Sequence, residues 1–127
     1  MTKTTVESRA HRILKRIDRF VETTSNPDAA FVLESGERVL GAYQNSPGAG
    51  DVYFTTLSVK FGLRTEHTVR YADIASVDVG PGKADADHLL IHHRSGETLR
   101  LPVDGGHGKA RDAFEVQRFL LRVVDDL

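Results

Sequence analysis

Residues 52–64 read Val-Tyr-Phe-Thr-Thr-Leu-Ser-Val-Lys-Phe-Gly-Leu-Arg, and this stretch decides the fold class. From Leu57 onward apolar side chains alternate with small or polar ones, the pattern of a strand with one buried face. Further strand-like segments separated by turn residues lie at 38–44, 69–71, 74–79, 88–93 and 98–103. We therefore predict about seven antiparallel strands between Arg38 and Val103.

Both ends of the chain have helical periodicity instead. At about 100° per residue, one face of the N-terminal segment collects apolar side chains. They are Val6, Ala10, Ile13, Leu14, Ile17, Phe20 and Val21. We predict an amphipathic helix in residues 1–25, ended by Pro27, and a separate domain in residues 26–127.

Residues 109–127 have a second, broader apolar face. Since small bent sheets hide their edges by closing into a barrel or a sandwich, we predict an α+β, mainly β, fold of this kind, with one open end capped by this C-terminal helix.

The composition narrows the class of protein. The chain has 127 residues, no cysteine and a net charge of −1. The absence of cysteine excludes a disulfide framework, a thiol nucleophile and thiolate metal ligands, and it fits a reducing compartment. No apolar stretch in the sequence reaches the length of a signal peptide core or a membrane span. We expect a cytoplasmic location.

The strand segments also resemble a known family. Val52–Phe61 carries Thr-Thr-Leu, and Val69–Val77 carries Tyr-x-Asp-Ile-x-x-Val. That order is similar to bacterial PH-like and GRAM-type domains, over residues 37–127. The resemblance implies a PH-like barrel, whose best-known activity is phosphoinositide binding by cations at the first hairpin. Here the loop from Gln44 to Asp51 has no Lys or Arg, so we do not expect binding of that kind.

Catalytic and metal motifs are weak. A phosphate loop needs Gly, four residues, then Gly-Lys-Ser/Thr, but Gly108-Lys109 is followed by Ala110. No nucleophile with a positioned base is recognisable, so we predict that the protein is not an enzyme and has no cofactor. A cryptic metal-dependent enzyme using His88, His92 and His107 is kept as an alternative.

The first helix carries the strongest functional feature. Residues 1–22 hold six Lys or Arg against three Asp or Glu, whereas residues 23–127 hold eleven against fifteen. Five cations lie on one flank: Arg9, Arg12, Lys15, Arg16 and Arg19. We predict that they contact an anionic partner, and that the apolar stripe of Ile13, Ile17 and Phe20 either packs on the barrel or mediates self-association. The acidic remainder argues against nucleic acid.

Together these features predict a non-enzymatic PH-like binding module for protein–protein interaction or self-association. The alternative is peripheral binding to anionic lipid through the basic flank of the first helix.

Overall fold

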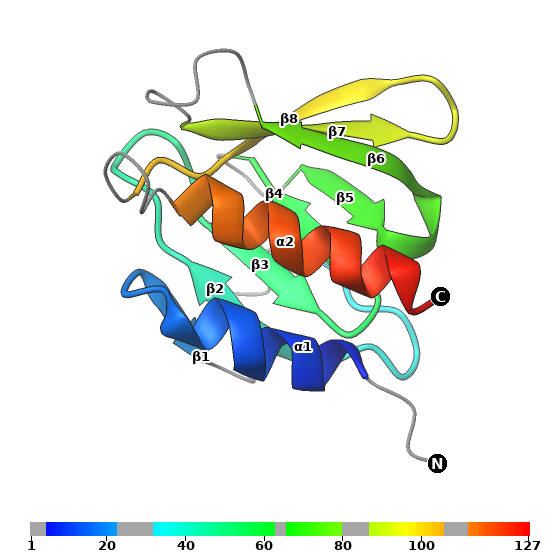
Figure 1. Ribbon diagram of the computed structural model, residues 1–127, viewed down its shortest axis with the longest axis horizontal. Helices are drawn as coiled ribbons and strands as arrows, with labels where there is room; N and C mark the ends of the chain where they lie inside the picture. The colour runs from blue at the N-terminus through cyan, green and yellow to red at the C-terminus, as the bar shows by residue number, and fades with distance from the viewer. Residues whose placement is uncertain (1–4, 23–31, 63–65, 80–86, 106–111) are drawn as a thin grey trace.

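The computed structural model describes residues 5–22, 32–62, 66–79, 87–105 and 112–127. These ranges hold two antiparallel sheets and two α-helices, α1 and α2 (Figure 1). The first sheet contains β1 (Phe20–Glu22), β2 (Val39–Tyr43), β3 (Val52–Thr55), β4 (Ser58–Phe61) and β5 (His67–Arg70), in that order. The second contains β6 (Ile74–Val79), β7 (His88–His93) and β8 (Thr98–Pro102). The predicted α+β, mainly β, class is confirmed.

The strands of the described ranges form two separate sheets and not a closed barrel. A 3-10 turn at Tyr71–Asp73 separates β5 from β6 and redirects the chain into the second sheet. Helix α2 (Asp112–Asp125) crosses in front of the gap between the sheets, packs on β6, and lies beside α1 (Figure 1). The apolar face of α2 therefore covers the opening that a barrel would close with hydrogen bonds.

The N-terminal helix is shorter than predicted. Helix α1 spans Val6–Ile13, with Thr5 as its N-cap, and a 3-10 turn at Leu14–Arg16 follows. The chain then extends into β1, which pairs with the edge of β2. Gly41 of β2 makes the close approach possible, because a Cβ there would meet the Phe20 ring and lie 2.7 Å from the Val21 carbonyl oxygen. Pairing with a sheet edge thus replaces the last turns of the predicted helix.

The core is continuous across both helices and both sheets. Phe119 of α2 lies edge-on to Phe54, with ring centroids 5.4 Å apart, and edge-on to Tyr71 at 6.1 Å. Ala10 and Leu14, from the first helical segment, belong to the same buried cluster. Neither helix in the described ranges has the length and apolarity needed to cross a membrane.

Strand β4, expected to be half-buried, is buried on both faces. Ser58 and Lys60 are 0% and 3% exposed. Both side chains face the buried carboxylate of Glu37, which accepts a hydrogen bond from Ser58 Oγ at 2.7 Å and lies 3.7 Å from Lys60 Nζ. The polar positions of the alternation therefore meet a charged partner inside the protein instead of water.

Candidate functional site: an arginine groove between the helices

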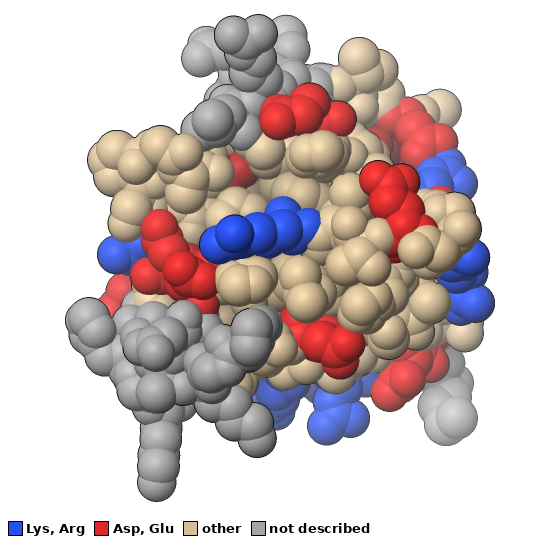
Figure 2. Space-filling view, turned by 90° about the horizontal axis from the view of Figure 1, so that it is seen from above, with Lys and Arg blue, Asp and Glu red and all other residues tan. Residues whose placement is uncertain are grey.

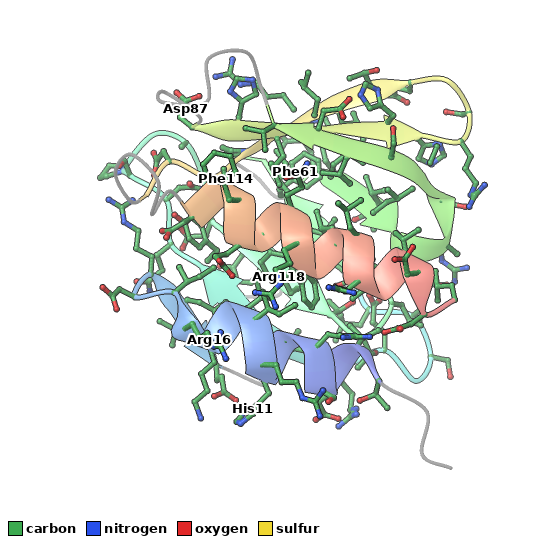
Figure 3. All side chains as sticks on the ribbon, viewed as in Figure 1. His11, Arg16, Phe61, Asp87, Phe114 and Arg118 are labelled. Atoms are coloured by element: carbon green, nitrogen blue, oxygen red, sulfur yellow. The ribbon has the colours of Figure 1, made fainter. Side chains whose placement is uncertain are left out.

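Five arginines line a groove of about 300 Å³ between α1 and α2. Arg9, Arg12 and Arg16 come from the first helical segment, and Arg118 and Arg122 come from α2. Ile13, which is 4% exposed, also lines it. Figure 3 shows Arg16 at the end of the first helical segment and Arg118 on α2, on the two sides of this groove. We call this feature the arginine groove.

Helical spacing explains how the arginines meet. Arg9, Arg12 and Arg16 are three and four residues apart, which keeps them on one flank of the first segment. Arg118 and Arg122 are four residues apart on α2 and share a flank for the same reason. The helices run antiparallel, since Arg9 near the start of α1 contacts Asp126 just after the end of α2. Their packing brings the two basic flanks face to face.

One arginine of the groove, Arg9, is already paired with a carboxylate of the chain itself. Arg9 Nε donates to Asp126 Oδ2 at 2.9 Å, and Arg9 Nη2 donates to Asp126 Oδ1 at 3.1 Å. These hydrogen bonds raise the pKa of Arg9 above its already high value. Both side chains are about a quarter exposed or less, at 22% and 24%. The pair shows that a guanidinium of this groove binds a carboxylate in the bidentate geometry that arginine favours.

The other four arginines are poorly neutralised. Arg118 Nη1 lies 3.9 Å from Glu115 Oε2, which is too far for a hydrogen bond. Within the described ranges, Arg12, Arg16 and Arg122 form no ion pair. Like charges held close together repel one another, so the groove keeps an unbalanced positive potential. A bound anion would relieve that repulsion and use the planar donor forks of the guanidinium groups.

The structure separates the five predicted cations. Arg9, Arg12 and Arg16 line the arginine groove. Lys15 instead pairs with Glu22, at 3.2 Å, and both side chains are more than half exposed. Arg19 donates to Asp104 at 2.8 Å.

Sequence reasoning missed Arg118 and Arg122. Their spacing of four residues was visible as a basic pair on the polar face of the C-terminal helix. Nothing in that local pattern indicates that this pair faces another helix, because the contact joins residues more than a hundred positions apart.

The apolar stripe predicted to mediate self-association lies inside the domain. Ile13, Ile17 and Phe20 are 4%, 4% and 9% exposed and belong to the core cluster. Phe20 packs edge-on against Phe54 with centroids 6.1 Å apart. These three side chains therefore pack inside the domain, as the first of the two roles considered for this stripe requires.

The histidines do not assemble a metal site in the described parts of the chain. His88 Nδ1 contacts Asp87 at 2.7 Å, whereas His92 Nε2 contacts Asp78 at 2.7 Å. Four residues along a strand separate the two histidines by about 13 Å, too far to share one ion. No group of three or more His, Cys, Asp or Glu suited to an ion occurs among the described residues. His107 lies outside them.

His92 lies between a carboxylate and a hydroxyl, those of Asp78 and Thr98, and contacts both. Its Nε2 faces Asp78, and its Nδ1 lies 3.1 Å from Thr98 Oγ1. This row of three side chains crosses the outer face of the three-stranded sheet, where Asp78 is 64% exposed. Seen from above, charges of both signs are scattered over this side of the molecule (Figure 2). A nucleophile needs a sheltered site with donors for developing charge, and an exposed cross-strand row does not provide one.

A larger hollow of about 1,110 Å³ lies between α1 and the strands β1 and β2. Charged and titratable groups of both kinds line it: Glu7, Glu22, Glu37, His11, Arg12 and Arg38. Glu7 and Arg38 pair with each other at 3.1 Å. Its lining therefore favours no single ligand chemistry, in contrast to the arginine groove.

Comparisons with known proteins identify no relative. No family model, no curated protein and no solved structure matches the chain. The PH-like resemblance therefore stays a prediction, and the function has to be inferred from the chemistry of the groove.

Proposed function

We propose that this protein is a non-enzymatic, PH-like binding module that holds an acidic segment of a protein partner in the arginine groove. The observation that carries the proposal is the convergence of five guanidinium groups from the two helical segments on about 300 Å³, with one of them, Arg9, already paired with a carboxylate. Guanidinium forks match the geometry of carboxylates, and a concave, like-charged site selects for an opposite charge.

The order of elements supports the PH-like part of the proposal. A five-stranded and a three-stranded antiparallel sheet are followed by a helix that covers the opening between them, and seven strands remain when β1 at the edge of the first sheet is set aside. Helix α1 and strand β1 are additions at the N-terminal side of this arrangement, and α1 supplies half of the groove.

A protein partner is favoured over a lipid surface. Helices that bind membranes insert an apolar face among the acyl chains, but the apolar stripe of the first segment is buried in the core. Large apolar side chains that are exposed in the described ranges include no aromatic residue. Anionic lipid is the second candidate, favoured by the exposure of Arg12 and Arg16, which leaves both cations open to headgroups.

The proposal is tested with poly-L-glutamate and with vesicles that contain anionic lipid. Poly-L-glutamate should bind, and the affinity should fall as salt is raised, because exposed charges are screened. Arg16→Gln should weaken binding several-fold, and Lys15→Gln should leave it near the wild-type value. The two substitutions remove the same charge from adjacent positions, but Lys15 does not line the groove.

Three outcomes contradict the proposal. Equal losses for Lys15→Gln and Arg16→Gln would mean that net charge, and not the arginine groove, attracts the polymer. Binding to anionic vesicles without binding to poly-L-glutamate would replace the protein partner with lipid. A lack of binding to both probes would exclude the groove as an anion site.

A further inference from the structure

We infer that the arginine groove holds two carboxylates of one partner segment, placed about one helical turn apart, so that the partner is a helix with acidic residues four positions apart on one face. This inference rests on the proposed function and specifies its ligand. It follows from the register of the two helices, from the spacing of the arginines along them, and from the carboxylate of the chain itself that pairs with Arg9.

The register follows from the contact between Arg9 and Asp126. Because the helices are antiparallel, moving forward along α1 corresponds to moving backward along α2. Arg12 then lies opposite the turn that holds Arg122, and Arg16 lies opposite the turn that holds Arg118. All four line the same groove. They therefore form two successive pairs of facing guanidinium groups, and Arg9 with its carboxylate ends the row.

The spacing of these pairs sets the spacing of the ligand. Arg118 and Arg122 are four residues apart in an α-helix, a rise of about 6 Å. Arg12 and Arg16 are separated by a similar distance, slightly longer because Leu14–Arg16 is a 3-10 turn. If a partner carries two carboxylates about 6 Å apart, each carboxylate would contact two guanidinium groups, one from each helical segment. Acidic residues four positions apart on a helix have this spacing and share a face.

The shape of the site favours a helical partner. The residues that line the groove come from two helical segments, and α1 and α2 lie side by side (Figures 1 and 3). A third helix can lie along such a groove with its side chains pointing in. Leu121 lies in the same turn of α2 as Arg118 and Arg122 and is 40% exposed, which offers an apolar contact beside the charges. Acidic residues next to an apolar position are the pattern of an amphipathic helix.

The contact between Asp126 and Arg9 shows, within the chain itself, how a partner carboxylate would bind an arginine of the groove. The Asp126 carboxylate receives two hydrogen bonds from one guanidinium and sits at the end of the row of arginines. A partner carboxylate seated between two facing arginines would make contacts of the same kind, with a second guanidinium added. Paired charge-assisted hydrogen bonds of this kind are among the stronger polar contacts in proteins.

The test compares two labelled peptides of about 20 residues, long enough to be helical in water. Both have the same alanine-rich composition and two glutamates each. In the first peptide the glutamates are four positions apart on one face, and in the second they are two positions apart on opposite faces. Circular dichroism checks that the peptides are equally helical, and fluorescence anisotropy measures binding to the full chain.

The one-face peptide should bind about tenfold more tightly, because the second peptide can seat one carboxylate at a time. Arg122→Gln should remove most of this preference, and Lys15→Gln should keep it. Equal affinity of the two peptides would overturn the paired-carboxylate inference, even if poly-L-glutamate binds and the proposed function stands. A preference that survives Arg122→Gln would also overturn it. Failure of poly-L-glutamate to bind would instead refute the proposed function itself.

Discussion

Replacing Glu37 with Gln should destabilise the fold strongly, because this carboxylate is buried and fully engaged. Its side chain is 0% exposed. Oε2 accepts hydrogen bonds from Thr55 Oγ1 and, at 2.7 Å, from Ser58 Oγ. Oε1 accepts from the Glu34 backbone N–H at 2.9 Å, and Lys60 Nζ lies 3.7 Å away. The group holds the segment before β2 against β3 and β4.

The expected cost follows from these contacts. Glutamine keeps one acceptor oxygen and places an NH₂ group at the other position, so either the Glu34 N–H or the two hydroxyls would face a donor. Hydrogen bonds to a charged group contribute about 1.5–3 kcal/mol each. Removing one partner of a buried ion pair costs about 3–5 kcal/mol. We therefore expect the free energy of unfolding to fall by about 3–5 kcal/mol.

Urea unfolding followed by circular dichroism measures this loss. With a slope of about 2 kcal/mol per molar, the midpoint should shift by about 2 M. Glu34→Gln is the matched control, since it makes the same change in an exposed ion pair with Arg70, in which both side chains are about half exposed. Exposed pairs contribute about 1 kcal/mol or less. If Glu37→Gln costs no more than Glu34→Gln, the reasoning about the buried carboxylate is refuted.

The same carboxylate predicts a pH dependence. Burial pushes the pKa of Glu37 up, but hydrogen bonds from Thr55, the Glu34 backbone and Ser58, together with the charge of Lys60, lower it below its ordinary value of 4.5. Since the pKa is lower in the folded state than in the unfolded state, the stabilisation is complete above pH 4.5 and is lost as the pH falls through the folded pKa. The difference in stability between wild type and Glu37→Gln should therefore shrink below that pH.

Two further substitutions test other parts of the fold. Tyr43→Phe should cost about 1–3 kcal/mol in urea unfolding, because the buried Tyr43 hydroxyl donates to Asp112 at 2.6 Å and accepts from the Gly105 N–H at 2.9 Å; a neutral result would mean that solvent replaces both contacts. Gly41→Ala should speed amide hydrogen exchange in β1, because its Cβ would meet the Phe20 ring and the Val21 carbonyl; unchanged exchange there would contradict the close packing of β1 on β2.

Elements with a local residue pattern were predictable from the sequence. The predicted segment 88–93 is β7, and the segment 98–103 contains β8, because alternation reports which side chains face a core. The helical period of the C-terminal segment likewise predicts α2, and every buried residue of α2 is apolar. The basic flank of the first helix was also visible, since residues three and four apart share a flank.

The element that packs against each of these patterns is known from the three-dimensional structure alone. The sequence pattern places Phe20 in a helical stripe, but the edge of β2, with Gly41, pairs with this segment and makes it a strand. The alternation predicts that Lys60 faces solvent. In the structure its side chain is buried beside Glu37, which is distant in the sequence. The arginine groove exists because α1 packs on α2, which brings residues 117 positions apart into contact. Periodicity gives the direction in which a side chain points on its own element, and it carries no information about the element that packs there.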